Sequence, residues 1–178
     1  MAAPARPGVP FSKRYTGFDG IAPGIKGGLQ QWINEARRTS FNALWNNGAY
    51  GVREMRGKKD MSVHATGRAW DASYRRRAHH PNNPSGRAAT LDWLDRVVLH
   101  ANDLGVELII DYAYNEDGAF GRGWRCDRQA WQPYKQGTVW GGGQKTSDWY
   151  HIEISPMFAN SAPTVRRAFS AIFPEIPR

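Results

Sequence analysis

Two histidines and two aspartates lie at spacings that match one metal-activated hydrolytic site. The first pair belongs to the stretch SVHATGRAWD at 62–71, and the second pair belongs to DWYH, much later in the chain. Two imidazoles and one carboxylate are ligands that Zn²⁺ accepts, and three protein ligands leave a fourth position open for water. We therefore take His64, Asp71 and His151 as candidate zinc ligands. Asp148 is left over as the candidate general base, which would take a proton from that water.

The spacing of the first two ligands requires the chain to reverse between them. An extended segment from His64 to Asp71 would span about 23 Å, which is far too long for two ligands of one ion. Gly67 is best suited to the reversal, because glycine adopts backbone conformations that other residues avoid. We expect Asp71 on the strand that follows, with its carboxylate directed back at His64. His151 then arrives from a strand remote in sequence, so the site is built across a sheet.

Two carboxylates compete for the role of base. Asp148 precedes His151 by three residues and cannot share its face in a regular strand, so this reading requires a loop or a bulge between them. Glu153 follows His151 by two residues and does share its face. Glu153 is therefore either the base itself or a residue that does not touch the metal but orients the imidazole.

The rest of the chain predicts the elements that must position this site. Apolar residues at helical spacing predict helices, and alternating or buried stretches predict strands. The expected helices are at about 27–38, 90–104 and 162–172. The expected strands are at 50–55, 67–74, 106–112 and 149–154. Asn46-Asn47-Gly48 indicates a turn, 75–87 indicates a basic loop, and 115–147 indicates a glycine-rich loop. Thr90 is the expected N-cap and Gly105 the expected stop of the middle helix.

Short strands mixed with helices, without regular βαβ alternation, predict an α+β fold. We expect a central antiparallel sheet flanked by helices, with the zinc site at the sheet. The chain has 178 residues and no low-complexity linker, so it fits a single domain over 1–178 with its core at about 27–173.

Composition narrows the choice of partner. Lys and Arg outnumber Asp and Glu by 24 to 16, and the net charge of +8 favours an anionic partner such as nucleic acid, an anionic cell wall or an acidic membrane surface. No apolar run reaches the roughly eighteen residues of a membrane span. The N-terminus lacks the apolar core of a signal peptide, which predicts synthesis in the cytoplasm without a cleaved leader. Cys126 is the single cysteine, and we expect it to be a small buried residue rather than a nucleophile.

The pattern SxHxxGxAxD followed by DxxHxE resembles the zinc peptidases of the D-Ala-D-Ala carboxypeptidase/VanY group, peptidase family M15. The resemblance covers roughly 50–155 and implies the fold of that group. It also implies His64, Asp71 and His151 as zinc ligands and Asp148 as catalytic base, although many relatives carry Glu at the last position.

The same resemblance implies an arginine upstream of the first motif that steadies the substrate carbonyl or the oxyanion. Arg53 is the first candidate for this role and Arg56 is the second. Ser62 either hydrogen-bonds substrate or caps the turn.

Within the group the chain looks most like phage endolysin peptidases, including L-alanyl-D-glutamate endopeptidases. This implies a monomeric zinc enzyme, made in a host cytoplasm, that cleaves the stem peptides of peptidoglycan. A D-Ala-D-Ala carboxypeptidase and a cross-bridge endopeptidase are alternatives. A non-catalytic wall-binding module with a structural ion is an alternative of another class. A nucleic-acid binder built on the basic loop 75–87 has no motif behind it beyond charge, and we do not expect one.

Overall fold

A computed structural model describes residues 14–55, 58–74, 86–114, 118–119, 121–135 and 148–176. Its helices are α1 (Gly27–Thr39), α2 (Leu91–Leu99), α3 (Pro156–Ala159) and α4 (Ala162–Ile172), with short 3₁₀ helices η1 (Val63–Thr66) and η2 (Arg87–Thr90). Its strands are β1 (Trp45–Gly48), β2 (Ala69–Ser73), β3 (Val106–Asp111), β4 (Arg122–Arg125), β5 (Ala130–Pro133) and β6 (Trp149–Ile154).

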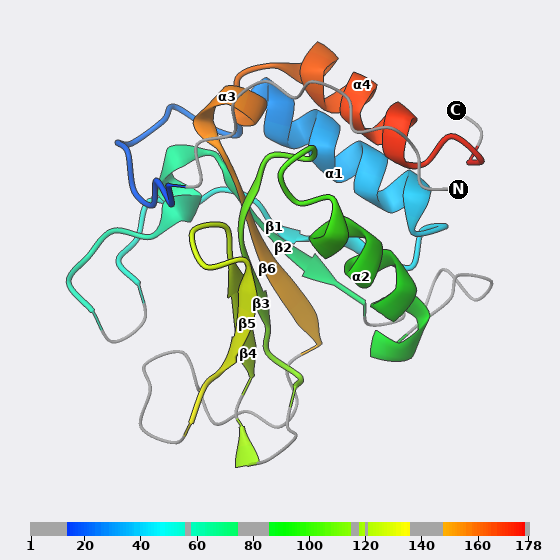
Figure 1. The fold of residues 1–178 in the computed structure, drawn as a ribbon. Helices are drawn as coiled ribbons and strands as arrows, with labels where there is room; N and C mark the ends of the chain where they lie inside the picture. The colour runs from blue at the N-terminus through cyan, green and yellow to red at the C-terminus, as the bar shows by residue number, and fades with distance from the viewer. Residues whose placement is uncertain are drawn as a thin grey trace.

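The strands form a six-stranded sheet in the order β1-β2-β6-β3-β4-β5, and every neighbouring pair is antiparallel (Figure 1). The α+β class with an antiparallel sheet, expected from the sequence, is therefore confirmed. The last long strand in the chain, β6, lies between β2 and β3. Residues from the two ends of the sequence motif thus become neighbours at the middle of the sheet.

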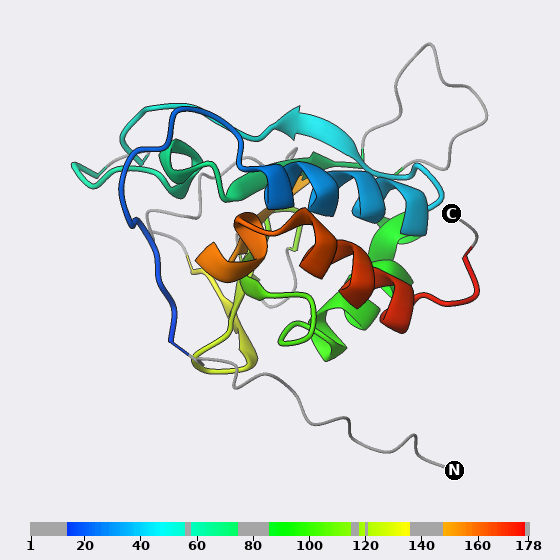
Figure 2. The same cartoon turned by 90° about the horizontal axis from the view of Figure 1, so that it is seen from above.

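The helices pack on one face of this sheet around Trp32. Helices α1 and α4 lie side by side in both Figure 1 and Figure 2. The Trp32 ring on α1 is fully buried and makes edge-to-face contacts with Trp70, Trp93 and Phe169, which come from β2, α2 and α4. Such aromatic pairs add to the free energy gained by burial alone. The core therefore ties each of these helices to the strand that carries Asp71.

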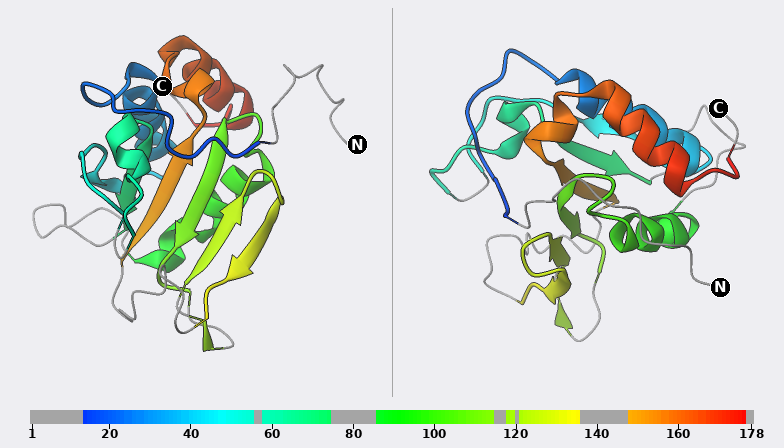
Figure 3. Two further views of the ribbon diagram at one scale, coloured as in Figure 1. Left: turned by 90° about the vertical axis from the view of Figure 1, so that its left-hand side faces the viewer. Right: turned by 45° about the horizontal axis from the view of Figure 1, so that its top comes forward.

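The other face of β2 and β6 is free to carry polar groups. Successive strand residues point to opposite faces, so the burial of Trp70 and Ile152 against the helices directs their neighbours away from the core. Asp71 and His151 consequently project from the opposite face. The left view of Figure 3 shows the N-terminal segment 14–26 crossing that face in front of β6 and β3.

Most predicted elements are confirmed, including the first and last helices and the strands that carry Asp71 and His151. Ser161 caps α4 by accepting from the Thr164 backbone N–H. The middle helix is shorter than expected, because a 3₁₀ turn replaces its start and α2 ends at Leu99. Thr90 does not act as an N-cap; its hydroxyl contacts the Arg87 carbonyl and the Tyr150 hydroxyl instead.

Three predictions about strands and loops are wrong. Asn46-Asn47-Gly48 belongs to edge strand β1, where a register shift at Gly48 absorbs the turn-prone sequence. The expected strand at 50–55 makes only an isolated bridge between Glu54 and Met61. The expected loop 115–147 contains the hairpin β4–β5. The greater part of the basic loop, 75–85, lies outside the described residues.

No helix in the described part of the chain combines the length and the apolar character that crossing a membrane would require.

Gly67 supplies the reversal that brings His64 back toward Asp71. It ends η1 in the left-handed region at φ 69°, which costs other residues about 1–2 kcal/mol. A Cβ at Gly67 would also lie 2.3 Å from the Gly24 carbonyl oxygen. Gly67→Ala is therefore expected to lower the free energy of unfolding, measured in urea, by at least about 2 kcal/mol.

Gly27→Ala is the matched control, because Gly27 begins α1 and a Cβ there meets no atom within 4 Å. This variant should be as stable as the parent or slightly more so. Equal stability of the two variants would contradict the described turn.

Cys126 is fully buried, and burial raises the pKa of its thiol to about 11. At pH 8 roughly one such thiol in a thousand is ionised, and the thiolate is the reactive form. We expect a thiol reagent to label the native protein far more slowly than the urea-unfolded protein, as followed by mass spectrometry. Equally fast labelling would show that the surroundings of Cys126 open readily.

Candidate metal centre

Asp71 and His151 are direct cross-strand partners in the antiparallel pair β2–β6. Side chains of such partners lie close together on the same face, and the Nδ1 atom of His151 is 2.9 Å from Oδ1 of Asp71. The two residues are separated by 80 positions in the chain. The register of the sheet, rather than any local turn, therefore brings this pair together.

His64 reaches the pair from η1, which precedes β2. The Ser62 hydroxyl accepts from the His64 backbone N–H at the start of η1, and Gly67 ends this turn. The His64 ring lies edge-on to the His151 ring, with a centroid distance of 5.0 Å. One ligand atom from each of His64, Asp71 and His151 lies within 4.8 Å of the other two, so the group could hold a metal ion.

The spacing between His64 and Asp71 is the one that two ligands of a tetrahedral metal ion need. Ligand atoms bound at 2.0–2.1 Å in a tetrahedral arrangement lie about 3.3 Å apart, and Nε2 of His64 is 3.3 Å from Oδ1 of Asp71. That nitrogen is buried and has no hydrogen-bond partner among the residues that the structure describes. A buried polar atom without a partner is costly, and coordination would satisfy it. The residues present therefore fit a metal ion.

The charges of the site also favour a cation. Burial acts to raise the pKa of Asp71, but the hydrogen bond with His151 and the nearby His64 outweigh it, so that this pKa is lowered overall. Burial acts to lower the pKa of His151, whereas its hydrogen bonds with Asp71 and Glu153 raise it to about 10. The ionised Asp71 carboxylate is thus favoured by a positive charge beside it, from a proton on His151 or from a metal.

Glu153 lies on the same face as His151 and contacts the far side of its ring. Oε1 of Glu153 is 2.9 Å from Nε2 of His151, whereas Asp71 contacts Nδ1. A carboxylate on the second ring nitrogen is the usual way to fix the tautomer and orientation of a metal-binding histidine. Of the two roles weighed from the sequence, this geometry favours the orienting role for Glu153.

Asp148 lies immediately before β6, and its carbonyl oxygen accepts from the Tyr74 N–H and from the Ser73 hydroxyl. These bonds extend the β2–β6 pairing, which is regular from Trp149 onward. Of the loop or bulge expected between Asp148 and His151, β6 shows no bulge, and Asp148 itself lies outside the strand. Burial and Asp111 are the main causes that raise the pKa of Tyr74, and the Asp148 carboxylate raises it further. Asp148 therefore lies within electrostatic reach of the Tyr74 hydroxyl.

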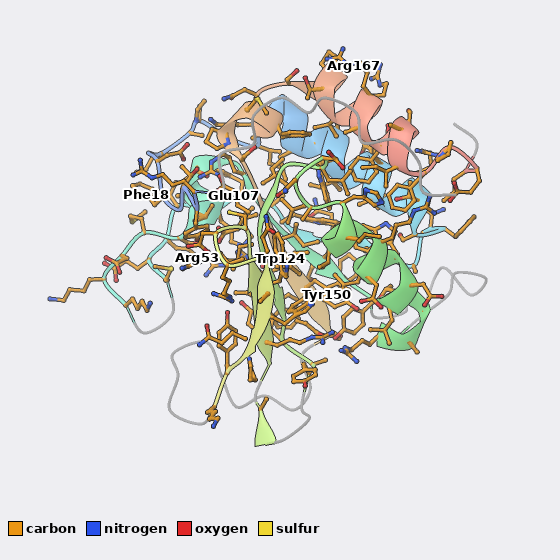
Figure 4. The ribbon with its side chains drawn as sticks, viewed as in Figure 1. Phe18, Arg53, Glu107, Trp124, Tyr150 and Arg167 are labelled. Carbon is orange, nitrogen blue, oxygen red and sulfur yellow. The ribbon has the colours of Figure 1, made fainter. Side chains whose placement is uncertain are left out.

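Arg53 is an exposed residue on the same side of the molecule as η1. In Figure 4, Arg53 lies on the side of the strands away from α2, and Tyr150 lies on the side of α2. The Arg53 carbonyl accepts from the Ser62 N–H, which ties it to the turn that carries His64. Ser62 is buried and caps that turn, in line with the second of its two expected roles. Arg56 lies outside the described residues.

Two tyrosines near the site were not among the sequence candidates. Burial raises the pKa of Tyr112, and the carboxylates of Asp71 and Glu153 raise it further while Arg53 opposes them. Tyr15 donates a hydrogen bond to Oε2 of Glu153 at 2.8 Å. Tyr112 follows β3 directly, so its position could have been inferred from the end of a buried strand. No local signal marks Tyr15, because only the fold brings it to Glu153.

Searches against models of protein families, against curated proteins and against solved structures found no match to this chain.

Proposed function

We propose that this chain is a zinc-dependent peptidase that hydrolyses the stem peptides of bacterial peptidoglycan. The convergence of His64, Asp71 and His151 on the face of the sheet opposite α1 and α4 carries the proposal. Those three residues occupy the ligand positions of the pattern that resembles the D-Ala-D-Ala carboxypeptidase/VanY group. The fold of that group is part of the same proposal, and the antiparallel sheet with helices on one face is compatible with it.

Each residue has a role that its surroundings support. Nε2 of His64, Oδ1 of Asp71 and Nδ1 of His151 would hold the ion. Zinc held in this way supplies Lewis-acid activation of a water molecule and of the substrate carbonyl. Glu153 is engaged with the opposite edge of the His151 ring, so we assign proton transfer from water to the leaving amine to Asp148. For this step the Asp148 carboxylate has to turn toward Asp71.

We assign substrate binding beside the ligands to Arg53. It is exposed, and its charge and that of Asp71 both act on the Tyr112 hydroxyl. A guanidinium at this place would stabilise negative charge that develops on a carbonyl oxygen during acyl transfer. Ser62, by contrast, is occupied as the cap of η1.

The net charge of +8 agrees with a substrate in an anionic wall. The L-alanyl-D-glutamate bond is our first choice of scissile bond, with D-Ala-D-Ala and cross-bridge bonds as alternatives. Mass spectrometry of the fragments released from purified peptidoglycan distinguishes these bonds. If the protein binds the wall but releases no fragment, the peptidase proposal is wrong and the non-catalytic wall-binding module takes its place.

Loss of one ligand should remove the metal. His64→Ala leaves one imidazole and one carboxylate, so we expect bound zinc to fall from about one per chain to far below it in elemental analysis after dialysis. His100→Ala is the control, because the half-exposed His100 contacts Asp103 on the surface. Chelation of the parent protein should stop fragment release, and added zinc should restore it. Full activity of a zinc-free His64→Ala protein would contradict the proposal.

The two candidate bases can be separated by their effects on metal and turnover. Asp148→Asn keeps the size of the side chain but cannot accept the proton, so we expect bound zinc near parental levels and turnover reduced by about 10²–10⁴-fold. Glu153→Gln should weaken zinc binding as well, because the carboxylate orients His151. The reverse pattern, with zinc retained in Glu153→Gln and turnover unchanged in Asp148→Asn, would make Glu153 the base.

A further inference from the structure

The N-terminal segment 14–26 contacts both halves of the candidate metal centre. At one end the Tyr15 hydroxyl donates to Glu153 at 2.8 Å. Further along, the Ala22 N–H donates to the carbonyl of Ala65, the neighbour of His64, at 2.9 Å. The segment then joins α1 after the Lys26 N–H has donated to the Gly67 carbonyl at 3.2 Å. It therefore touches the residues next to both histidine ligands.

Buried charges fix the course of this segment. Arg68 is fully buried and donates to the carbonyls of Gly17 and Ile154 as well as to the Asp19 carboxylate. Glu107 accepts from the Thr16 hydroxyl at 2.6 Å and pairs with Arg68 at 3.4 Å. Removing one partner from such a buried network leaves an uncompensated charge. The segment is thus held next to β3 and β6, where Figure 3 shows it crossing the sheet.

Tyr15 is clamped from two sides. The Arg125 guanidinium lies over its ring at 5.1 Å from the centroid, a cation–π contact, while its hydroxyl bonds the buried Glu153 carboxylate. Burial and the charge of Glu153 raise the pKa of Tyr15, so the hydroxyl remains a donor at all physiological pH values. One Glu153 oxygen accepts from Tyr15, and the other contacts Nε2 of His151.

We propose that Tyr15 is a positioning residue of the metal centre, which acts through Glu153 to hold the His151 ring with Nδ1 directed at the metal. The chain of contacts runs from Tyr15 to Glu153, then to His151, and ends at Asp71. Without the tyrosine hydroxyl, the carboxylate loses the bond that fixes its rotamer, and the imidazole loses its fixed partner. The inference rests on the proposed metal site and adds the N-terminal segment to it.

The test is the zinc affinity of Tyr15→Phe, measured by competition with a chromogenic chelator. Outer partners of metal-binding histidines contribute about 10–100-fold to affinity, and we expect about a tenfold loss from this more distant hydroxyl. The visible absorption spectrum of the Co²⁺-substituted protein should also change, because it reports the geometry of the ligands. Urea unfolding shows whether Tyr15→Phe remains folded.

Tyr50→Phe is the matched control. The Tyr50 hydroxyl donates to the Ala22 carbonyl at 2.7 Å, so this variant also removes a tyrosine hydroxyl that anchors the same segment, but one that does not contact Glu153. It should keep the parental zinc affinity and Co²⁺ spectrum. Equal changes in both variants would show that general anchoring of the segment, and not the Tyr15 hydroxyl, is responsible, and this would overturn the inference.

A double-mutant cycle tests whether Tyr15 acts through Glu153. In a Glu153→Ala background, Tyr15→Phe should cause no further loss of zinc affinity. An undiminished loss would contradict a role through Glu153.

Parental affinity and spectrum in Tyr15→Phe alone would overturn the inference while the peptidase proposal stands. If the parent binds zinc and depends on Tyr15 but releases no peptidoglycan fragment, the proposed activity fails and the inference stands. A parent that binds no zinc would overturn both.

Discussion

Asp71 and His151 meet across β2 and β6 because their strand neighbours are buried on the other face. Trp70 packs against Trp32, and Ile152 lies in the same core. A slip of one residue in either strand would move an indole or an isoleucine onto the polar face and a charged ligand into the core. Burial of apolar surface therefore selects the register, and the register sets the 2.9 Å contact between Nδ1 and Oδ1. His64, Glu153 and the N-terminal segment are all arranged around that contact.

Buried charge is the second constraint on the sheet. Glu107, Asp111 and Glu153 each have almost no exposure to solvent, and Arg68 has none. Each of these groups has a partner: Arg68 pairs with Glu107, Arg87 and Arg122 pair with Asp111, and Glu153 contacts His151 and Tyr15. Their mutual geometry is narrowly defined, because a displaced partner leaves a charge in a poorly solvated place. The orientation of a candidate metal ligand in such a network is therefore set by residues that would not touch the ion.

The sequence predicted the parts of the site that local patterns encode. Ser62, Gly67 and the alternation around Asp71 identify a capped turn, a reversal and a strand, and all three are present. The sequence did not predict the hairpin β4–β5, because short strands such as RGWR and AWQP lack the apolar run of β3. It also missed the contact of Tyr15 with Glu153, which spans 138 positions. Long-range contacts depend on the packing of the whole sheet, and no window of sequence contains that information.

The order of strands has a consequence for when the site can come into existence. His64 and Asp71 lie in the first half of the chain, but β6 is the last strand to be synthesised and has to insert between β2 and β3. Contacts of such high sequence separation form late, since the entropy of closing long loops must be overcome first. A nascent or partly folded chain therefore carries the ligands without the site. The candidate metal centre could therefore hold an ion only after β6 is seated between β2 and β3, so completion of the site depends on completion of folding.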